Sequence, residues 1–150
     1  MRLVVQRVRR ASVEVAGEVV GAIGPGMLIL LCVLEGDGER EVLRLAEKVA
    51  RFRFFHDDRG RMDRSALDEG LEVLLVSQFT LAADGRKGRR PSFDRAAAPA
   101  VAEPLVERFR QHLESLGLTV ACGRFGAEME VTLVNHGPVT FVLEEPPQAP

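Results

Sequence analysis

The residues best suited to chemistry lie where apolar strands give way to polar side chains. The first such stretch, Ser77–Thr80, offers two hydroxyls, an amide and a phenyl ring directly after a run of apolar residues. Hydroxyl and amide groups clustered there can line a cleft and hydrogen-bond a polar substrate. The alternative is purely structural, a strand that ends in a turn with Ser77 and Thr80 bonding nearby backbone groups. Spacing alone leaves both interpretations open.

The second stretch is Asn135–Thr140, in which Gly137 and Pro138 separate two apolar segments. Gly followed by Pro commonly marks a turn, and a turn alone accounts for the dipeptide. A functional role would require a cis bond, which about 5–6% of X–Pro bonds adopt in folded proteins. We expect a loop between two strands here.

The third stretch is a run of cations inside a polar loop from Ala83 to about Arg95. Its members are Arg86, Lys87, Arg89 and Arg90. A solvated loop is the usual explanation of such a run. Contact with phosphates is the more specific explanation. A patch this short suits the end of an RNA better than a long duplex.

The common catalytic motifs do not occur. There is no GxSxG elbow, no HExxH and no phosphate-binding P-loop. His136 could approach Ser77 in space, but nothing in the sequence pairs them. Cys32 and Cys122 are solitary, so the sequence indicates neither a zinc site nor a disulfide framework. We therefore expect no metal.

Composition narrows the classes of partner. The 150 residues include eight Phe but no Trp or Tyr, which makes a base-stacking platform improbable. A net charge of −2 argues against coating a long nucleic-acid backbone, so we expect no DNA binding. The longest apolar run, Met27–Leu34, is far short of the ~20 residues of a membrane span. No secretion-signal pattern is present, and we expect a cytoplasmic protein without a membrane partner.

The elements that must position these stretches follow from hydrophobic periodicity. Strands are expected at Arg2–Val8, Ser12–Val15, 18–23, Met27–Leu34, Glu72–Phe79, Leu118–Ala121, Glu130–Val134 and Val139–Leu143. One helix should follow an N-cap at Asp37, and a second should cover Pro99 to Leu116, kinked at Pro104 or beginning near it.

Most of these connections are too short for parallel crossovers. The pattern therefore predicts an α+β fold with a mostly antiparallel, β-barrel-like sheet and two main helices. We expect a single domain over residues 1–143, since a chain of this length normally forms one domain. Residues 144–150 (EEPPQAP) contain nothing apolar enough to dock and should form a flexible tail.

Read together, these stretches resemble the bacterial D-aminoacyl-tRNA deacylases. The similarity runs from MRLVVQRVRRASVEV through VSQFTLAAD and RKGRRPSF to GRFGAEMEVTLVNHGPVT, nearly the whole chain. Two signatures of that family, SQFTL at Ser77–Leu81 and NxGPVT at Asn135–Thr140, are intact. Jointly they are far more specific than either alone.

The resemblance implies a compact α+β domain that works as a homodimer without metal or organic cofactor. Ser77, Gln78, Phe79 and Thr80 would form the floor of the active site. Gly137 and Pro138, joined by a cis bond, would reach in from the other subunit. The reaction would be hydrolysis of the ester that joins a D-amino acid, or glycine mischarged on tRNA(Ala), to the 3′-terminal adenosine of a tRNA.

The resemblance also implies roles for three further residues. Phe125 and Met129 match positions that line the adenosine pocket, although both also suit an ordinary core. Arg7 matches a residue near the Gly-Pro motif. The family leaves open whether Thr80 is a nucleophile or the RNA assists its own hydrolysis. With no base evident beside Thr80, we favour assistance by the ribose hydroxyl.

A rigid Gly-Pro wall placed where an L side chain would lie excludes L-substrates sterically but cannot exclude glycine. The sequence departs from the family at Ala82-Ala83, Pro104 and His136. None of these is a proposed catalytic residue, though His136 could make activity sensitive to pH near neutrality. Two alternatives remain. One is a non-catalytic module of the same fold that binds acylated tRNA ends, and the other is an esterase of small molecules.

Overall fold

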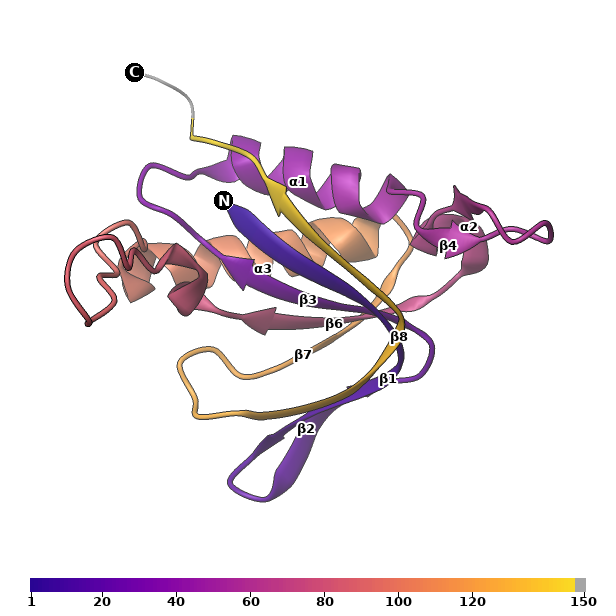
Figure 1. Ribbon diagram of the computed structural model, residues 1–150, viewed down its shortest axis with the longest axis horizontal. Coiled ribbons are helices and arrows are strands. Elements are labelled where there is room, and N and C mark those ends of the chain that lie inside the picture. Colours follow the sequence, from indigo (N-terminus) through magenta and orange to yellow (C-terminus); the bar gives the residue numbers. More distant parts are fainter. Residues whose placement is uncertain (148–150) are drawn as a thin grey trace.

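A computed structural model describes residues 1–147 of the chain and shows a curled sheet with helices packed on one face (Figure 1). The strands are β1 Arg2–Val15, β2 Glu18–Ile23, β3 Gly26–Cys32, β4 Phe55–His56, β5 Met62–Arg64, β6 Glu72–Ser77, β7 Thr119–Cys122 and β8 Glu130–Glu144. The helices are α1 Glu39–Arg51, α2 Ala66–Glu69 and α3 Pro99–Ser115, with a 3-10 helix η1 over Phe79–Ala82.

The main sheet has the strand order β2-β1-β3-β6-β7, with β8 paired to β1 beside that path. Strand β1 is antiparallel to β2, β3 and β8, whereas β3–β6 and β6–β7 are parallel pairs. The two parallel pairs arise because α1 and α3 supply long crossovers. The predicted α+β, barrel-like fold with two main helices is confirmed. The expectation concerned most connections, and these two junctions are the ones long enough for parallel crossovers.

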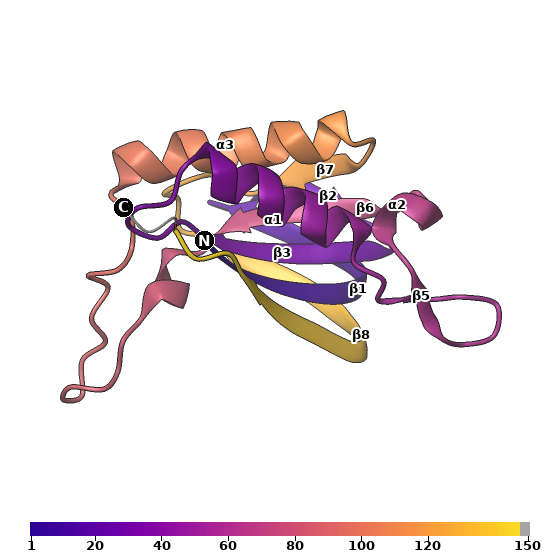
Figure 2. The same ribbon diagram turned by 90° about the horizontal axis from the view of Figure 1, so that it is seen from above.

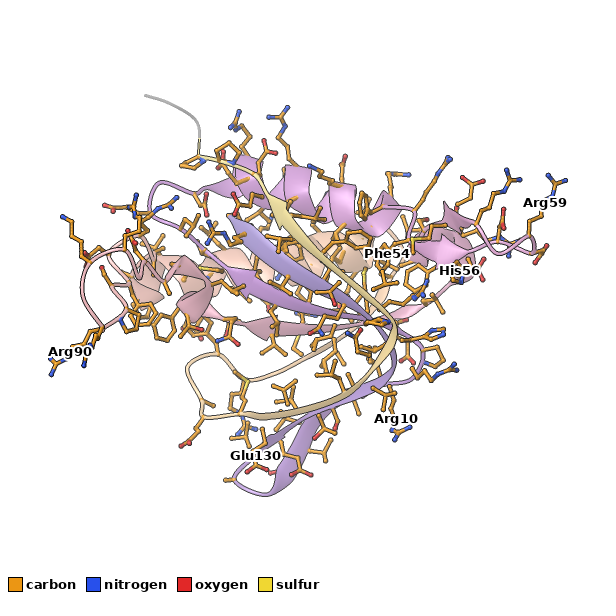
Figure 3. The ribbon with its side chains drawn as sticks, in the orientation of Figure 1. Arg10, Phe54, His56, Arg59, Arg90 and Glu130 are labelled. Atoms are coloured by element: carbon orange, nitrogen blue, oxygen red, sulfur yellow. The ribbon has the colours of Figure 1, made fainter. Side chains whose placement is uncertain are left out.

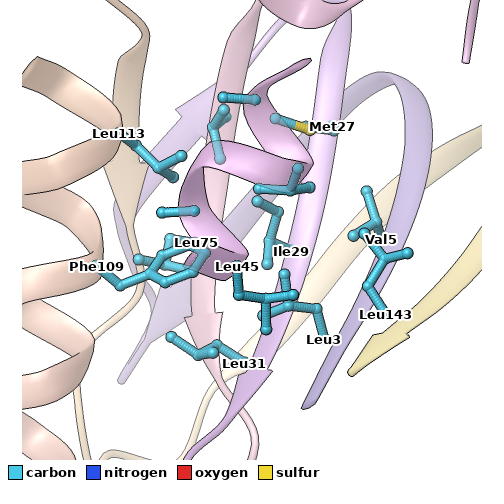
Figure 4. Close-up of a cluster of buried hydrophobic side chains, with 14 of the residues drawn as sticks. Leu3, Val5, Met27, Ile29, Leu31, Leu45, Leu75, Phe109, Leu113 and Leu143 are labelled. Atoms are coloured by element: carbon cyan, nitrogen blue, oxygen red, sulfur yellow. The ribbon is translucent and has the colours of Figure 1, made fainter. Parts of the chain in front are cut away.

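Helices α1 and α3 lie side by side over one face of the sheet (Figure 2). The helices and strands share one hydrophobic core. Successive side chains of a strand point to opposite faces of the sheet, so alternate residues of each strand face the helices. In the close-up, Leu45, Phe109 and Leu113 from the helices pack onto Leu3, Ile29, Leu31 and Leu75 from the strands (Figure 4). A second, smaller cluster fills the opposite face around Val8, Val13 and Leu74.

Strand β1 is continuous, although two separate strands were expected in this region. Leu3 and Val5 face the helix-covered core, whereas Val8, Ala11 and Val13 face the smaller cluster. The pairing with β8 shifts between Gln6 and Val8 and again between Val8 and Arg10. These bulges turn the strand, so that its two halves bury apolar side chains on opposite faces of the sheet.

Three local predictions are wrong. Helix α1 is capped by Gly38, because the Asp37 carboxylate instead accepts hydrogen bonds of 2.7 Å from the Met1 ammonium and from the Leu34 amide. Strand β6 ends at Ser77, two residues early, because the chain turns into η1. The expected loop at Asn135–Thr140 is part of the long strand β8.

Past residue 143 the chain stays close to its N-terminus. Strand β8 runs through Glu144, and the Glu145 carbonyl accepts a 2.7 Å hydrogen bond from the Met1 ammonium. Residues 148–150 of the expected flexible tail lie outside the described residues. Within residues 1–147, no helix has the length and apolar character to span a membrane.

Candidate active site

A pocket of about 620 Å³ opens where β6 ends. Ser77, Gln78 and Phe79 form one wall, and Phe125 and Met129 from the connection between β7 and β8 form another. The first turns of α3 and the Phe93 ring complete it. The structure thus brings together five of the residues singled out from the sequence, which lie about fifty positions apart along the chain.

The polar wall is held by the strand it follows. Leu31 on β3 pairs with Ser77 in the parallel register, and the Gln78 amide donates a 2.7 Å hydrogen bond to the Leu31 carbonyl. The chain then coils into η1, in which the Leu81 amide bonds the Gln78 carbonyl at 3.2 Å. Because η1 begins immediately after a buried strand, its first residues are fixed at the mouth of the pocket.

Thr80 does not line the pocket but is joined to it. Its hydroxyl oxygen accepts a hydrogen bond from the Gln78 side-chain amide. Phe79 is 59% exposed, and its ring meets that of Phe93 edge-to-face with centroids 5.2 Å apart. Among residues 1–147 the backbone N–H groups of Phe79 and Thr80 have no hydrogen-bond partner. Both residues begin η1, where backbone N–H groups have no acceptor within the helix itself.

Among residues 1–147, no aspartate, glutamate, histidine, lysine or arginine lines the pocket. Thr80 and Ser77 consequently have no general base among the lining residues, as a serine- or threonine-based nucleophilic mechanism would need. What the pocket offers is shape, hydroxyl and amide groups, and backbone donors. Such a site can orient a reactive ester and stabilise an oxyanion, but it does not itself supply a proton acceptor.

Gly137, Pro138 and Arg7 lie elsewhere, and none of them lines the pocket. The Gly137–Pro138 peptide bond is cis. It lies in β8 where the pairing with β1 is irregular. Gln6 pairs with Thr140 and Val8 with Asn135, so the β8 residues from 136 to 139 lie opposite one β1 residue, Arg7. Gly137 and Pro138 are exposed. A single chain therefore presents this segment outward, away from its own pocket.

Arg7 anchors that segment. Its side chain is only 4% exposed, and its guanidinium donates to the His136 carbonyl at 3.0 Å and to the Phe54 carbonyl at 2.9 Å. Burial lowers the pKa of Arg7. Burial also lowers the pKa of His136, and the charges of Arg9 and Arg7 act in the same direction. His136 is thereby biased toward its neutral form near pH 7.

Gly137 has a backbone φ of +129°, a conformation that side chains rarely adopt. A Cβ at this position would lie 2.9 Å from the Val139 amide nitrogen and 3.0 Å from Arg7 Nη2. Glycine is therefore required here both by backbone conformation and by the close approach of Arg7.

The cationic loop extends beyond the body of the molecule, with Arg90 at its tip (Figure 3). An isolated pairing of Asp84 with Ser92 closes its base. Arg86 is bound to Asp84, whose pKa it lowers to about 2. Lys87, Arg89 and Arg90 are exposed and form no ion pair within residues 1–147. Phe93 connects the loop to Phe79 and thus to the pocket.

Two contributors were missed by the sequence analysis. Phe93 lies in the RKGRRPSF stretch, and its place in a chain with only eight aromatic residues was the available signal. The apolar start of α3, including Ala102 and Val106, reads as ordinary core in the sequence. Within the described residues no group of three or more His, Cys, Asp or Glu side chains is arranged to hold a metal ion.

Known proteins with similar sequences identify the family to which this chain belongs. Residues 4–144 match the family model described as D-Tyr-tRNA(Tyr) deacylase. D-aminoacyl-tRNA deacylases from Roseiflexus castenholzii and Syntrophotalea carbinolica are 60% and 56% identical over 144 residues. That alignment covers 96% of this chain in both cases and 92% and 97% of the two relatives.

Two solved structures share the fold. A c-Myc DNA unwinding element binding protein superimposes with a TM-score of 0.91 at 40% identity, covering 97% of this chain and 99% of that one. A probable eukaryotic D-amino acid tRNA deacylase superimposes with a TM-score of 0.84 at 16% identity, covering 95% and 97%. The second likeness speaks for the fold alone. On the match over residues 4–144 and the identity to its relatives, the chain belongs to the D-Tyr-tRNA(Tyr) deacylase family.

Proposed function

We propose that the pocket beside Ser77–Thr80 binds the acylated 3′-terminal adenosine of a tRNA and that hydrolysis of the aminoacyl ester takes place there. Family membership makes the chain a hydrolase, a D-aminoacyl-tRNA deacylase. The observation that carries the site assignment is the pocket itself, which joins the SQFTL segment to Phe125 and Met129. An apolar cavity with a few convergent polar groups suits a nucleoside.

The chemistry is positional. Water adds to the ester carbonyl carbon, the bond from that carbon to the ribose oxygen breaks, and free D-amino acid and tRNA leave. The N–H groups of Phe79 and Thr80 are free to stabilise the oxyanion. No lining residue among residues 1–147 can accept the proton from water. We therefore assign to the neighbouring ribose hydroxyl the role of orienting the water and relaying its proton to the departing ribose oxygen. Thr80 holds the Gln78 side chain through its hydroxyl and is not the nucleophile.

Rejection of L-substrates needs a second copy of the chain. Gly137 and Pro138 are exposed and absent from their own pocket, which supports a homodimer in which each chain supplies them to its partner. The anchored Gly137 backbone would occupy the space of an L side chain. Glycine has no side chain to clash, so glycyl-tRNA(Ala) would also be hydrolysed.

The exposed cations at the loop tip would contact phosphates near the acceptor end of the tRNA, next to the Phe79–Phe93 pair. No metal or organic cofactor enters this scheme. We place the enzyme in the cytoplasm, where aminoacylated tRNA is found. We expect no binding to DNA, although one similar structure is named for a DNA element.

The test is a deacylation time course with matched D-Tyr-tRNA, L-Tyr-tRNA and Gly-tRNA(Ala). We expect rapid release from the D and glycine substrates and little from the L substrate. Equal rates for D- and L-tyrosine would refute the exclusion of L-substrates by Gly137 and Pro138. Binding of acylated tRNA without turnover would instead identify a non-catalytic module. Equal activity on an amino-acid ester lacking RNA would identify a small-molecule esterase, and competition by DNA would contradict the expected partner class.

A further inference from the structure

A row of three side chains crosses the sheet beneath η1. Arg2 on β1 is paired in register with Glu144 on β8 and with Cys32 on β3. Residues paired in this way project from the same face of a sheet. The row lies at the edge where β6 also ends, because Leu31, next to Cys32, pairs with Ser77.

Two members of this row hold carbonyl groups of η1. The Arg2 guanidinium donates from Nη1 to the Leu81 carbonyl at 2.5 Å and from Nε to the Glu144 carboxylate. The Cys32 thiol donates to the Phe79 carbonyl, with Sγ and O 3.5 Å apart. The Arg2 side chain is 24% exposed, and Cys32 is fully buried.

These contacts matter because η1 is short. A 3-10 helix of four residues has few internal hydrogen bonds and poor hydrogen-bond geometry. The carbonyls at its end need partners from outside, and a cation is a favourable one there. Burial raises the pKa of the Cys32 thiol, which therefore keeps its proton at neutral pH and can donate.

We propose that Arg2 is a positioning residue for deacylation, which fixes η1 through Leu81 while Glu144 orients its guanidinium and Cys32 supports the same helix at Phe79. Arg2 does not line the pocket and acts only through η1. The inference rests on the proposed function, in which Phe79 and Thr80 present their N–H groups to the reacting ester. Displacement of reacting groups by about 1 Å can cost roughly 100-fold in rate.

The test compares Arg2→Met, which keeps the apolar stem, with Arg2→Lys, which retains a charged donor. The matched control is Arg44→Met, because Arg44 pairs with Glu145 at 3.0 Å, adjacent to Glu144, and within residues 1–147 has no hydrogen bond or ion pair with η1. We expect kcat on D-Tyr-tRNA to fall about 10- to 100-fold in Arg2→Met, with KM changed less than about threefold. Arg2→Lys should recover most of that loss, and Arg44→Met should match the wild type.

Amide hydrogen exchange supplies a second readout that does not depend on activity. The Leu81 and Ala83 amides, which bond within the η1 segment, should exchange faster in Arg2→Met than in Arg44→Met. Unchanged exchange and unchanged kcat would overturn the proposal, as would a rise in KM alone. Faster exchange with unchanged kcat would also overturn the positioning role and would count against η1 as the reacting site. If Arg2→Met does not fold, the same comparison is made with Arg2→Lys and Glu144→Gln, both of which should show smaller losses of kcat. A wild-type enzyme inactive on D-Tyr-tRNA would refute the proposed function. The exchange comparison would still test whether Arg2 holds η1 in place.

Discussion

Replacing Arg7 with methionine removes a buried cation while keeping an unbranched apolar stem. The guanidinium joins β1 to the β8 segment that holds Gly137, through the His136 carbonyl, and to the chain before β4, through the Phe54 carbonyl. At 4% exposure, neither bond can be replaced by bulk water without opening the structure. Arg7→Met should therefore destabilise the fold and loosen the Gly137 segment together.

The magnitude follows from those two bonds. A hydrogen bond from a charged group contributes about 1.5–3 kcal/mol, and an orphaned buried acceptor costs a similar amount. The desolvation that lowers the Arg7 pKa offsets part of this gain. We therefore expect the free energy of unfolding to fall by about 3 kcal/mol. With a urea m-value of about 2 kcal/mol/M, the unfolding midpoint should drop by about 1.5 M.

The assay is urea unfolding at fixed protein concentration, since a dimer couples stability to concentration. Arg9→Met is the control, because Arg9 is an exposed arginine on the same strand and surface substitutions usually change stability by less than about 0.5 kcal/mol. If Arg7→Met loses no more stability than Arg9→Met, the guanidinium does not hold the two carbonyls and the reasoning fails.

Three further predictions concern the loop, the Gly-Pro segment and a thiol. Arg90→Gln should reduce the slope of log affinity against log salt for acylated tRNA by about 0.7, whereas Arg86→Gln should change it less, because Arg86 is already paired. Equal changes in the two slopes would contradict that pairing. Gly137→Ala should lower kcat/KM for D-Tyr-tRNA about tenfold or more, because the new methyl crowds the backbone, and Gly85→Ala, in open space, should leave it unaltered. Burial raises the pKa of Cys122 to about 11, so alkylation by iodoacetamide should be slow at pH 8, with about one thiol in a thousand ionised, and should accelerate toward pH 11. Rapid alkylation of Cys122 at pH 8 in the folded protein would refute the raised pKa of this half-buried thiol.

Much of the architecture was predictable because its signals are local. Alternation of apolar and polar residues marked the strands, and hydrophobic periodicity marked α3 to within one residue. The errors occurred where a group distant in the sequence binds a residue that would otherwise form a local turn or helix cap. Asp37 has the side chain of an N-cap but binds the Met1 ammonium and the Leu34 amide instead. The Asn135–Thr140 segment reads as a turn but is held in β8 by pairing with β1.

For the candidate site, the residue types and their order are enough to show which residues are unusual. Polar groups after an apolar strand, a Gly-Pro step and a cationic loop are all visible without coordinates, and the motifs they form identify the family. Which of these residues share a pocket depends on the three-dimensional fold. Ser77 meets Phe125 and Met129 because the α3 crossover brings β7 beside β6, whereas Gly137 is carried away by the pairing of β8 with β1. Strand register and crossover direction result from burying apolar faces along the whole chain, so no local stretch of sequence contains them.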